Sequence, residues 1–334
     1  MEKRKTAARK DYLSIIDRWM PWTGGIVFAL LAGIMLVGQN SDYLLTVQER
    51  SLFTPNETFW NEIMAKPGGF FRWMGCYLTQ YFYYPAVGSS MLILIWIATY
   101  GATLKAFRLK KSASTLALIP LFALLASVID LGYWLYYMKH AGYWFSESLS
   151  FLILILSTWG YSRLRSWWKI PYLAAWAIAG YPLLGWYALL GVAIMGIITT
   201  KKCAKAIYGT AIAAILFVPY GWYHYYTEMR IEDAWTSKFP LFQLDKYTSW
   251  ITSIPFFILI AATILTALIY RFKDRIPKKG VSPKQHVAMA LFAVIAGCTG
   301  VWMANFDDYN YHTEMRMYRH VEKGEWMKAL EEVK

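Results

Sequence analysis

The chain has little of what soluble enzymes and secreted domains depend on. Charged residues make up only 16% of its 334 residues, and it contains three cysteines and five histidines. The cysteines, Cys76, Cys203 and Cys298, are too far apart to indicate a disulfide framework or a metal site. No two histidines lie four residues apart, and the sequence has no phosphate-binding loop, dinucleotide fingerprint or nucleophile elbow. These absences argue against the common soluble enzyme classes and against a histidine metal centre.

The chain is instead rich in apolar residues, at 57% of the total, with 18% aromatic. The apolar runs are long enough to cross the ~30 Å hydrocarbon layer, where backbone groups must be satisfied within helices. We therefore expect an all-α, polytopic transmembrane bundle. The predicted spans are 22–39, 84–104, 115–138, 145–162, 170–184, 185–200, 204–222, 248–270 and 286–304. The fifth and sixth meet near Pro182 and Gly185, so they form either a helical hairpin or one broken helix.

The basic residues predict the orientation of these nine spans. If the first span starts inside, 22 of the 34 Lys and Arg residues fall on the cytoplasmic side. This asymmetry is the positive-inside rule, and it also attracts anionic lipid headgroups. It predicts an integral membrane protein with a cytoplasmic N-terminus and an exported C-terminus. The net charge of +13 is therefore not a sign of nucleic-acid binding.

The first exported loop, 40–83, is the longest one. Pro55 and Asn56 favour the start of a helix, and the run 66–69 (Lys-Pro-Gly-Gly) favours a stop. An aromatic stripe then follows over 70–84, which predicts an interfacial helix at headgroup depth. Such a helix either anchors the chain in the membrane or forms a platform that docks a lipid-linked substrate.

An eight-residue string occurs twice, at Tyr223–Arg230 and Tyr309–Arg316, and six of its eight positions are identical. Each copy follows an apolar run. On a helix, the first Tyr, the Thr and the Arg of each copy share one face. Two interpretations remain open: both copies are interfacial anchors, or both flank one exported cleft.

The tail that follows the last span resembles the first half of a tetratricopeptide-type hairpin. The resemblance rests on Gly324, Trp326 and Ala329, which mark a turn into a second helix. We therefore divide the chain into a transmembrane domain, 1–304, and the start of an exported helical segment, 305–334. This segment would be the site for a protein partner.

Carboxylates and arginines of the exported face are the candidates for chemistry. Asp42 and Glu49 lie just beyond the first span, and either carboxylate could accept a proton from an acceptor hydroxyl. Arg72, Arg230 and Arg316 could bind a phosphate through paired hydrogen bonds. Further candidate residues are Asp130, Glu228, Asp307, Asp308 and Glu314. No metal motif is present, and a divalent cation would be the only cofactor that a phosphate substrate calls for.

Asp130 is the ionisable residue deepest in a predicted span. A buried membrane carboxylate usually faces a cavity, a partner or a pathway. A hydrogen bond to a tyrosine or to a helix end would also satisfy it. A transporter would show inverted repeats and paired broken spans, whereas the repeat here has one orientation. Transport is therefore the third of the functions considered.

The layout over residues 1–104 resembles the GT-C membrane glycosyltransferases. Those proteins have a first span that starts inside, followed by a long exported loop with an interfacial helix and an early acidic residue. The resemblance implies a transferase that uses a donor linked to an isoprenoid phosphate, with Asp42 or Glu49 as the base. The acidic pair usual in that superfamily is absent, because Tyr43 follows Asp42.

The string Gln48–Phe53 is also similar to a string in bacterial polytopic membrane proteins that have no assigned activity. From these observations we expect a GT-C-like glycosyl (or related group) transferase that acts on a lipid-linked donor. The alternative is a non-catalytic anchor that presents an exported helical-repeat domain.

Overall fold

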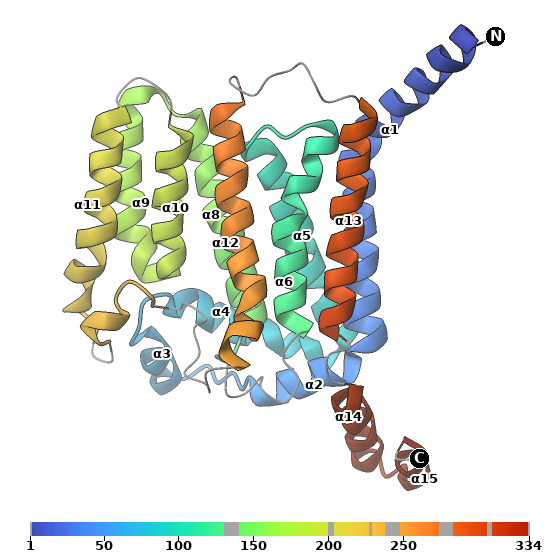
Figure 1. The fold of residues 1–334 in the computed structure, drawn as a ribbon. Coiled ribbons are helices and arrows are strands. Elements are labelled where there is room, and N and C mark those ends of the chain that lie inside the picture. Colours follow the sequence, from blue (N-terminus) through green and yellow to red (C-terminus); the bar gives the residue numbers. More distant parts are fainter. Residues whose placement is uncertain are drawn as a thin grey trace.

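The computed structural model describes residues 2–129, 140–199, 204–226, 229–237, 248–273, 283–305 and 309–332. All secondary structure in these ranges is helical. Figure 1 shows an upright bundle with the N-terminus at one end and the C-terminus at the other. Of the predicted site residues, Asp130, Glu228, Asp307 and Asp308 lie outside the described ranges.

Most helices run between the two ends of the bundle (Figure 1). Near the N-terminus, α1 (Glu2–Gly33) continues as the π-helical turn η1 (Ile34–Gln39). The other helices that build the bundle are α5 (Pro85–Ala106), η3 (Lys111–Ala117), α6 (Ile119–Ile129), α8 (Tyr143–Arg163), α9 (Lys169–Leu184), α10 (Trp186–Ile198), α11 (Ala204–Tyr223), α12 (Thr248–Phe272) and α13 (Pro283–Asn305).

Six stretches of the described chain are long and apolar enough to cross a membrane. They are Asp17–Gln39, Pro85–Ala106, Lys111–Ile129, Ala204–Tyr223, Ile254–Phe272 and Val287–Ala304. The helix α10 is apolar but shorter, with 13 residues. Six candidate spans identify a multi-pass membrane protein, whereas the predicted nine crossings remain a prediction.

The fifth and sixth predicted spans are two helices of a hairpin. They meet at Gly185, whose φ of 60° and ψ of −134° allow the chain to reverse. The two helices then pack side by side. The Trp176 indole donates to the Ala188 carbonyl at 3.2 Å. A Cβ atom at Gly191 would lie only 2.7 Å from the Trp176 ring nitrogen. A single broken helix is therefore excluded.

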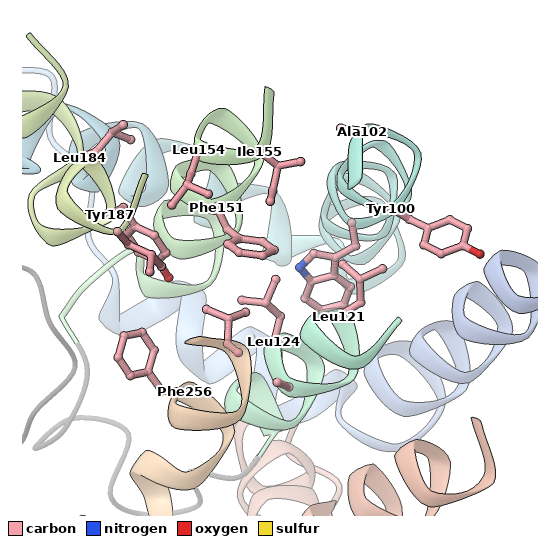
Figure 2. Packing of buried hydrophobic residues seen from close by; sticks show 14 of the residues in the cluster. Tyr100, Ala102, Leu121, Leu124, Phe151, Leu154, Ile155, Leu184, Tyr187 and Phe256 are labelled. Carbon is pink, nitrogen blue, oxygen red and sulfur yellow. The ribbon is translucent and has the colours of Figure 1, made fainter. Parts of the chain in front are cut away.

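The core lies between the central helices of the bundle. Figure 2 shows Leu121 and Leu124 of α6, Phe151 and Leu154 of α8, and Tyr187 of α10 directed toward one another. The Trp96 indole of α5 is fully buried and donates to the Ser148 hydroxyl of α8 at 2.9 Å. On the outside, α1 and α13 expose large apolar side chains such as Trp22 and Phe292. This is the pattern of a bundle whose outer surface faces lipid.

One end of the bundle carries three short helices, and we call it the loop end. These helices are α2 (Ser41–Arg50), α3 (Glu57–Met64) and α4 (Gly69–Thr79). The predicted helix start is confirmed, because the Asn56 side chain accepts from the Phe59 amide at 2.8 Å. The predicted stop is also confirmed, because Gly68 has a φ of 84° between α3 and α4. The helix α2 was not expected as a separate element.

The turn between α3 and α4 is tied to the tip of the α9–α10 hairpin. The Gly68 amide donates to the Pro182 carbonyl at 2.8 Å. The Ser237 hydroxyl donates to the Pro67 carbonyl at 3.2 Å, and the Trp186 amide donates to the Ser237 carbonyl at 3.1 Å. Three segments far apart in the sequence therefore meet at the loop end.

The two copies of the repeated string have different conformations. The second copy is helical and opens α14 (Tyr309–Glu322), which is followed by α15 (Trp326–Glu332). In the first copy, Tyr223 ends α11, and residues 224–226 and 229–230 are not helical. The expectation of a shared helical face therefore fails for the first copy. Its Met229 is instead buried beside the Tyr181 hydroxyl, which also donates to the Ala234 carbonyl.

Candidate functional site at the loop end

The candidate site lies where α4 crosses the start of α8. Two glycines allow this crossing. A Cβ atom at Gly75 would lie 2.3 Å from the Gly142 carbonyl oxygen, and one at Gly142 would lie 2.3 Å from the Cys76 amide nitrogen. Gly142 also has a φ of 73°, which favours glycine. Because the two backbones touch, Arg72 and Cys76 of α4 lie beside the segment that leads into α8.

His140 and Glu147 form the polar centre of this crossing. His140 Nε2 lies 3.6 Å from Glu147 Oε1, and the Glu147 side chain is only 2% exposed. Burial lowers the pKa of His140 below its usual value. The nearby Glu147 carboxylate opposes this shift and the Arg72 charge adds to it. The imidazole therefore favours its neutral form at neutral pH.

The hydrogen bonds of His140 determine where its proton lies. His140 Nδ1 is 2.9 Å from the Ala141 carbonyl oxygen, which can only accept. Nδ1 must therefore carry a hydrogen. In the neutral ring Nε2 then has none and faces Glu147 Oε1 as a second proton-accepting atom, at 3.6 Å. Such a pair can take up one proton between its two members.

Aromatic side chains surround this pair and connect it to α2. The Glu147 carboxylate interacts electrostatically with the hydroxyls of Tyr143 and Tyr187. The Tyr143 ring lies 5.6 Å from the His140 ring and 6.1 Å from the Trp144 ring. Trp144 in turn lies 6.2 Å from Tyr43 of α2. The segment that carries Asp42 is thus joined to the pair through three aromatic contacts.

Arg72 supplies positive charge at this place. Its Nε atom is buried and has no hydrogen-bond partner among the described residues. Its charge acts on His140 and also on Cys76, whose thiol pKa burial raises to about 11. An arginine with an unsatisfied N–H group is prepared to bind an anion, because a buried unpaired donor is costly.

The two candidate bases, Asp42 and Glu49, have different surroundings. Glu49 forms an ion pair with Arg319 of α14, whose Nη1 donates to Glu49 Oε1 at 2.7 Å and whose Nη2 donates to Oε2 at 3.2 Å. Asp42 is half-buried in the first turn of α2, and its carboxylate has no such pairing in the described part of the chain. The Asp42 carboxylate is therefore available for chemistry, while the Glu49 carboxylate is engaged.

The three predicted phosphate-binding arginines lie in three different surroundings. Arg72 lies beside His140, as described above. Arg316 donates to Glu332 of α15 at 2.9 Å and is part of the C-terminal hairpin. Arg230 is exposed and precedes the short helix η6 (Ile231–Asp233). Glu314 is exposed on α14. Of these three arginines, only Arg72 acts on the His140–Glu147 pair, through the effect of its charge on His140.

Sequence reasoning missed three residues of this region: His140, Glu147 and Arg319. None of the three was among the predicted site residues. The available signal was Gly142 between His140 and Glu147, because a glycine ahead of an apolar helix permits a close crossing. Within the described residues, no group of three or more His, Cys, Asp or Glu side chains is placed to hold a metal ion.

Comparison with known proteins identifies a family. Residues 18–334 match the model of a family of unknown function (DUF6057), so the chain belongs to that family. Neither a curated protein nor a solved structure matches the chain.

Proposed function

We propose that this protein is a membrane-embedded transferase of the GT-C type that moves a glycosyl or related group from an isoprenoid-phosphate donor at the loop end. The observation that supports it best is the buried Arg72 Nε, which has no hydrogen-bond partner among the described residues, close to the pair of His140 and Glu147. A phosphate donor needs positive charge at its oxygens, and transfer to a hydroxyl needs a group that takes up a proton.

The described contacts support a role for each residue. Asp42 is the base that accepts the proton of the acceptor hydroxyl, because Glu49 is already paired with Arg319. Arg72 binds the phosphate of the donor and stabilises it as it leaves. His140 and Glu147 can take up a proton close to that phosphate. Arg230 and Arg316 lie outside this cluster and do not bind the donor phosphate.

The proposal includes nine crossings, a cytoplasmic N-terminus and a loop end on the exported side of a bacterial inner membrane. The charge distribution supports this orientation. The described basic segments 105–111 and 163–169 lie at the end of the bundle opposite to α2, α3 and α4 (Figure 1). Carboxylates such as Asp42 and Glu147 lie at the loop end.

Native mass spectrometry of the gently purified full chain tests the proposal. We expect one polyprenyl phosphate per chain, lost in Arg72→Ala and partly restored in Arg72→Lys. Arg230→Ala is the matched control, because it removes an exposed charge outside the cluster. Bulk phospholipid alone, unchanged by Arg72→Ala in a folded variant, would exclude a donor site at this place.

A second candidate function has its own observation. The hairpin of α14 and α15 exposes Trp326 (63%), Met327 (73%) and Leu330 (58%) on one short helix. Exposed large apolar groups on a helical hairpin are typical of a surface that packs against another helix. This supports an anchor that presents a binding segment. If Asp42→Asn and Arg72→Ala leave the protein's cellular role intact while Trp326→Ala and Leu330→Ala together abolish it, the anchor is the better description.

A further inference from the structure

A deep groove lies at the end of the bundle opposite to the loop end, between α1, α5 and the end of α8. We call this the basic end, after residues 105–111, 163–169 and 271–273. The groove has a volume of about 1220 Å³. Its inner walls are apolar and include Ile26, Ala29 and Ile97. Since Ile97 lies eight residues before Lys105 on α5, the groove extends about 12 Å along the helix, at 1.5 Å per residue.

Four basic side chains line the mouth of the groove: Lys105, Arg108, Lys110 and Arg163. All four are exposed. Lys105 and Arg163 lie over the same Trp159 ring, at 5.7 Å and 4.9 Å from its centre. None of the four forms an ion pair in the described part of the chain.

Asp17 of α1 does not neutralise this mouth. It pairs with Lys111 at 3.3 Å and accepts from the Ser112 amide at 2.8 Å. Both contacts involve the segment just beyond the groove. Among the described side chains, the positive charge at the mouth therefore remains available for a ligand from outside the protein.

The backbone at the mouth provides independent support. After α5, the Leu109 amide bonds back to the Leu104 carbonyl at 3.0 Å, and Arg108 takes the left-handed conformation with a φ of 52°. Glycine is usual at this position of a helix end. Lys111 is also left-handed, with a φ of 57°, but its ion pair with Asp17 accounts for that. At Arg108 the helix-end bond itself requires this conformation, and the exposed Arg108 side chain lines the groove.

Aromatic residues indicate the depth of this end in a membrane. Trp167 and Trp168 follow α8 and are 61% and 50% exposed, and Trp22 on the groove wall is 70% exposed. Exposed tryptophans are enriched at the headgroup level of bilayers. The mouth of the groove therefore lies at headgroup depth and its apolar walls at acyl-chain depth.

We propose that this groove binds one anionic phospholipid, with its phosphate at Arg108 and Lys110 and an acyl chain between α1 and α5. The charge of the mouth selects an anionic lipid, because the ammonium group of a zwitterionic headgroup would meet the same unneutralised cations. The groove and the proposed transferase site share α8 but lie at its two ends, with Arg163 at the groove and Glu147 at the loop end, so the two sites are separate.

Native mass spectrometry of the full chain in detergent, titrated with phosphatidylglycerol or phosphatidylcholine, tests this proposal. We expect one phosphatidylglycerol to bind at least tenfold more tightly than phosphatidylcholine. Each basic side chain at a membrane surface contributes about fivefold in affinity, so Arg108→Ala with Lys110→Ala should weaken binding about 25-fold. The control pair Lys273→Ala with Lys284→Ala removes the same charge outside the groove and should have a much smaller effect.

A second variant separates the groove from general electrostatic attraction. A Cβ atom added at Gly101 meets nothing within 4 Å, so Gly101→Phe fills the groove without a backbone clash. We expect it to abolish phosphatidylglycerol binding while the unfolding temperature stays the same. Equal losses in the two double variants, or unchanged binding in a folded Gly101→Phe protein, would overturn the proposal. Arg72→Ala, at the loop end, should leave this binding unchanged.

Discussion

The guanidinium of Arg319 donates to both carboxylate oxygens of Glu49, a residue 270 positions earlier in the chain. The same guanidinium donates to Glu322 at 2.6 Å and to the Thr46 hydroxyl at 2.9 Å. Arg319 is only 6% exposed. The contact therefore fixes the C-terminal helix α14 on α2, which is the first helix of the loop end.

Replacing Arg319 should detach the C-terminal hairpin. Arg319→Ala leaves the Glu49 carboxylate and the Thr46 hydroxyl without their donor. Because Glu49 is 45% exposed, solvent screens part of the loss, and we expect about 2 kcal/mol of destabilisation. Limited proteolysis at the start of α14 and thermal unfolding in detergent measure this. Lys328→Ala, which breaks an exposed ion pair within α15, is the control and should cost less than about 0.5 kcal/mol.

One experiment should show which of the two candidate bases, Asp42 or Glu49, accepts the proton. Asp42→Asn should stop transfer without changing the unfolding temperature, so the purified variant should retain a sugar-loaded lipid donor where the parent retains the free polyprenyl phosphate. Glu49→Gln should lower the unfolding temperature, because it weakens the Arg319 contact, and should leave the ratio of loaded to free donor unchanged. Mass spectrometry of the retained lipids reads out both. The assignment of the base would be reversed if only Glu49→Gln enriched the loaded donor.

The glycine contact between α4 and α8 should tolerate no side chain. Gly142→Ala places a Cβ 2.3 Å from the Cys76 amide nitrogen and requires a left-handed alanine. We expect a loss of about 3 kcal/mol or more, since backbone on both sides would have to move. Gly209→Ala is the control: it lies inside α11 with nothing within 4 Å, and helix propensity predicts a gain of up to about 1 kcal/mol. Thermal unfolding of the two variants should therefore shift in opposite directions.

The pKa of His140 predicts a pH dependence. It lies below the usual value of 6.5 in the folded protein, mainly through burial. The unfolded chain therefore binds a proton at a higher pH than the folded chain does. The contribution of His140 to stability is complete above 6.5 and is lost as the pH falls from there toward the folded pKa.

His140→Gln should remove this part of the pH dependence, which unfolding temperatures between pH 7.5 and pH 5 can measure. His224→Gln, which changes a histidine outside the cluster, should leave the curve of the parent protein unchanged. The opposite result would be a parent protein that gains stability relative to His140→Gln as the pH falls through 6.5. It would show that the folded protein holds the imidazole in its charged form.

Local chemistry made parts of the loop end predictable. Asn56 and Gly68 act on their immediate neighbours, so a helix start and a helix stop could be read from a few residues. The composition likewise predicts a multi-pass helical bundle, because crossing a membrane imposes a length and an apolar character on each helix. The six candidate spans follow from these constraints alone.

The candidate site depended on contacts that sequence does not display. Glu49 looks like a free surface carboxylate until Arg319 is placed beside it. His140 and Glu147 form a candidate site only together with Arg72. Arg72 belongs to another helix, α4, and the backbone contact between Gly75 and Gly142 brings the two segments close together. Residues 224–226 and 229–230 of the first repeat copy are not helical, and the tertiary contacts of Met229 and Ala234 with Tyr181 outweigh local preference there.

The tie between Ser237 and Pro67 has a consequence for how the chain is made. The two residues are 170 positions apart. At a synthesis rate of 5–20 residues per second, Pro67 precedes its partner by roughly 10 to 30 s. During that interval the turn between α3 and α4 lacks its hydrogen bond from Ser237, although its bond to Pro182 can form earlier. The loop end is therefore completed only after residue 237 has been made.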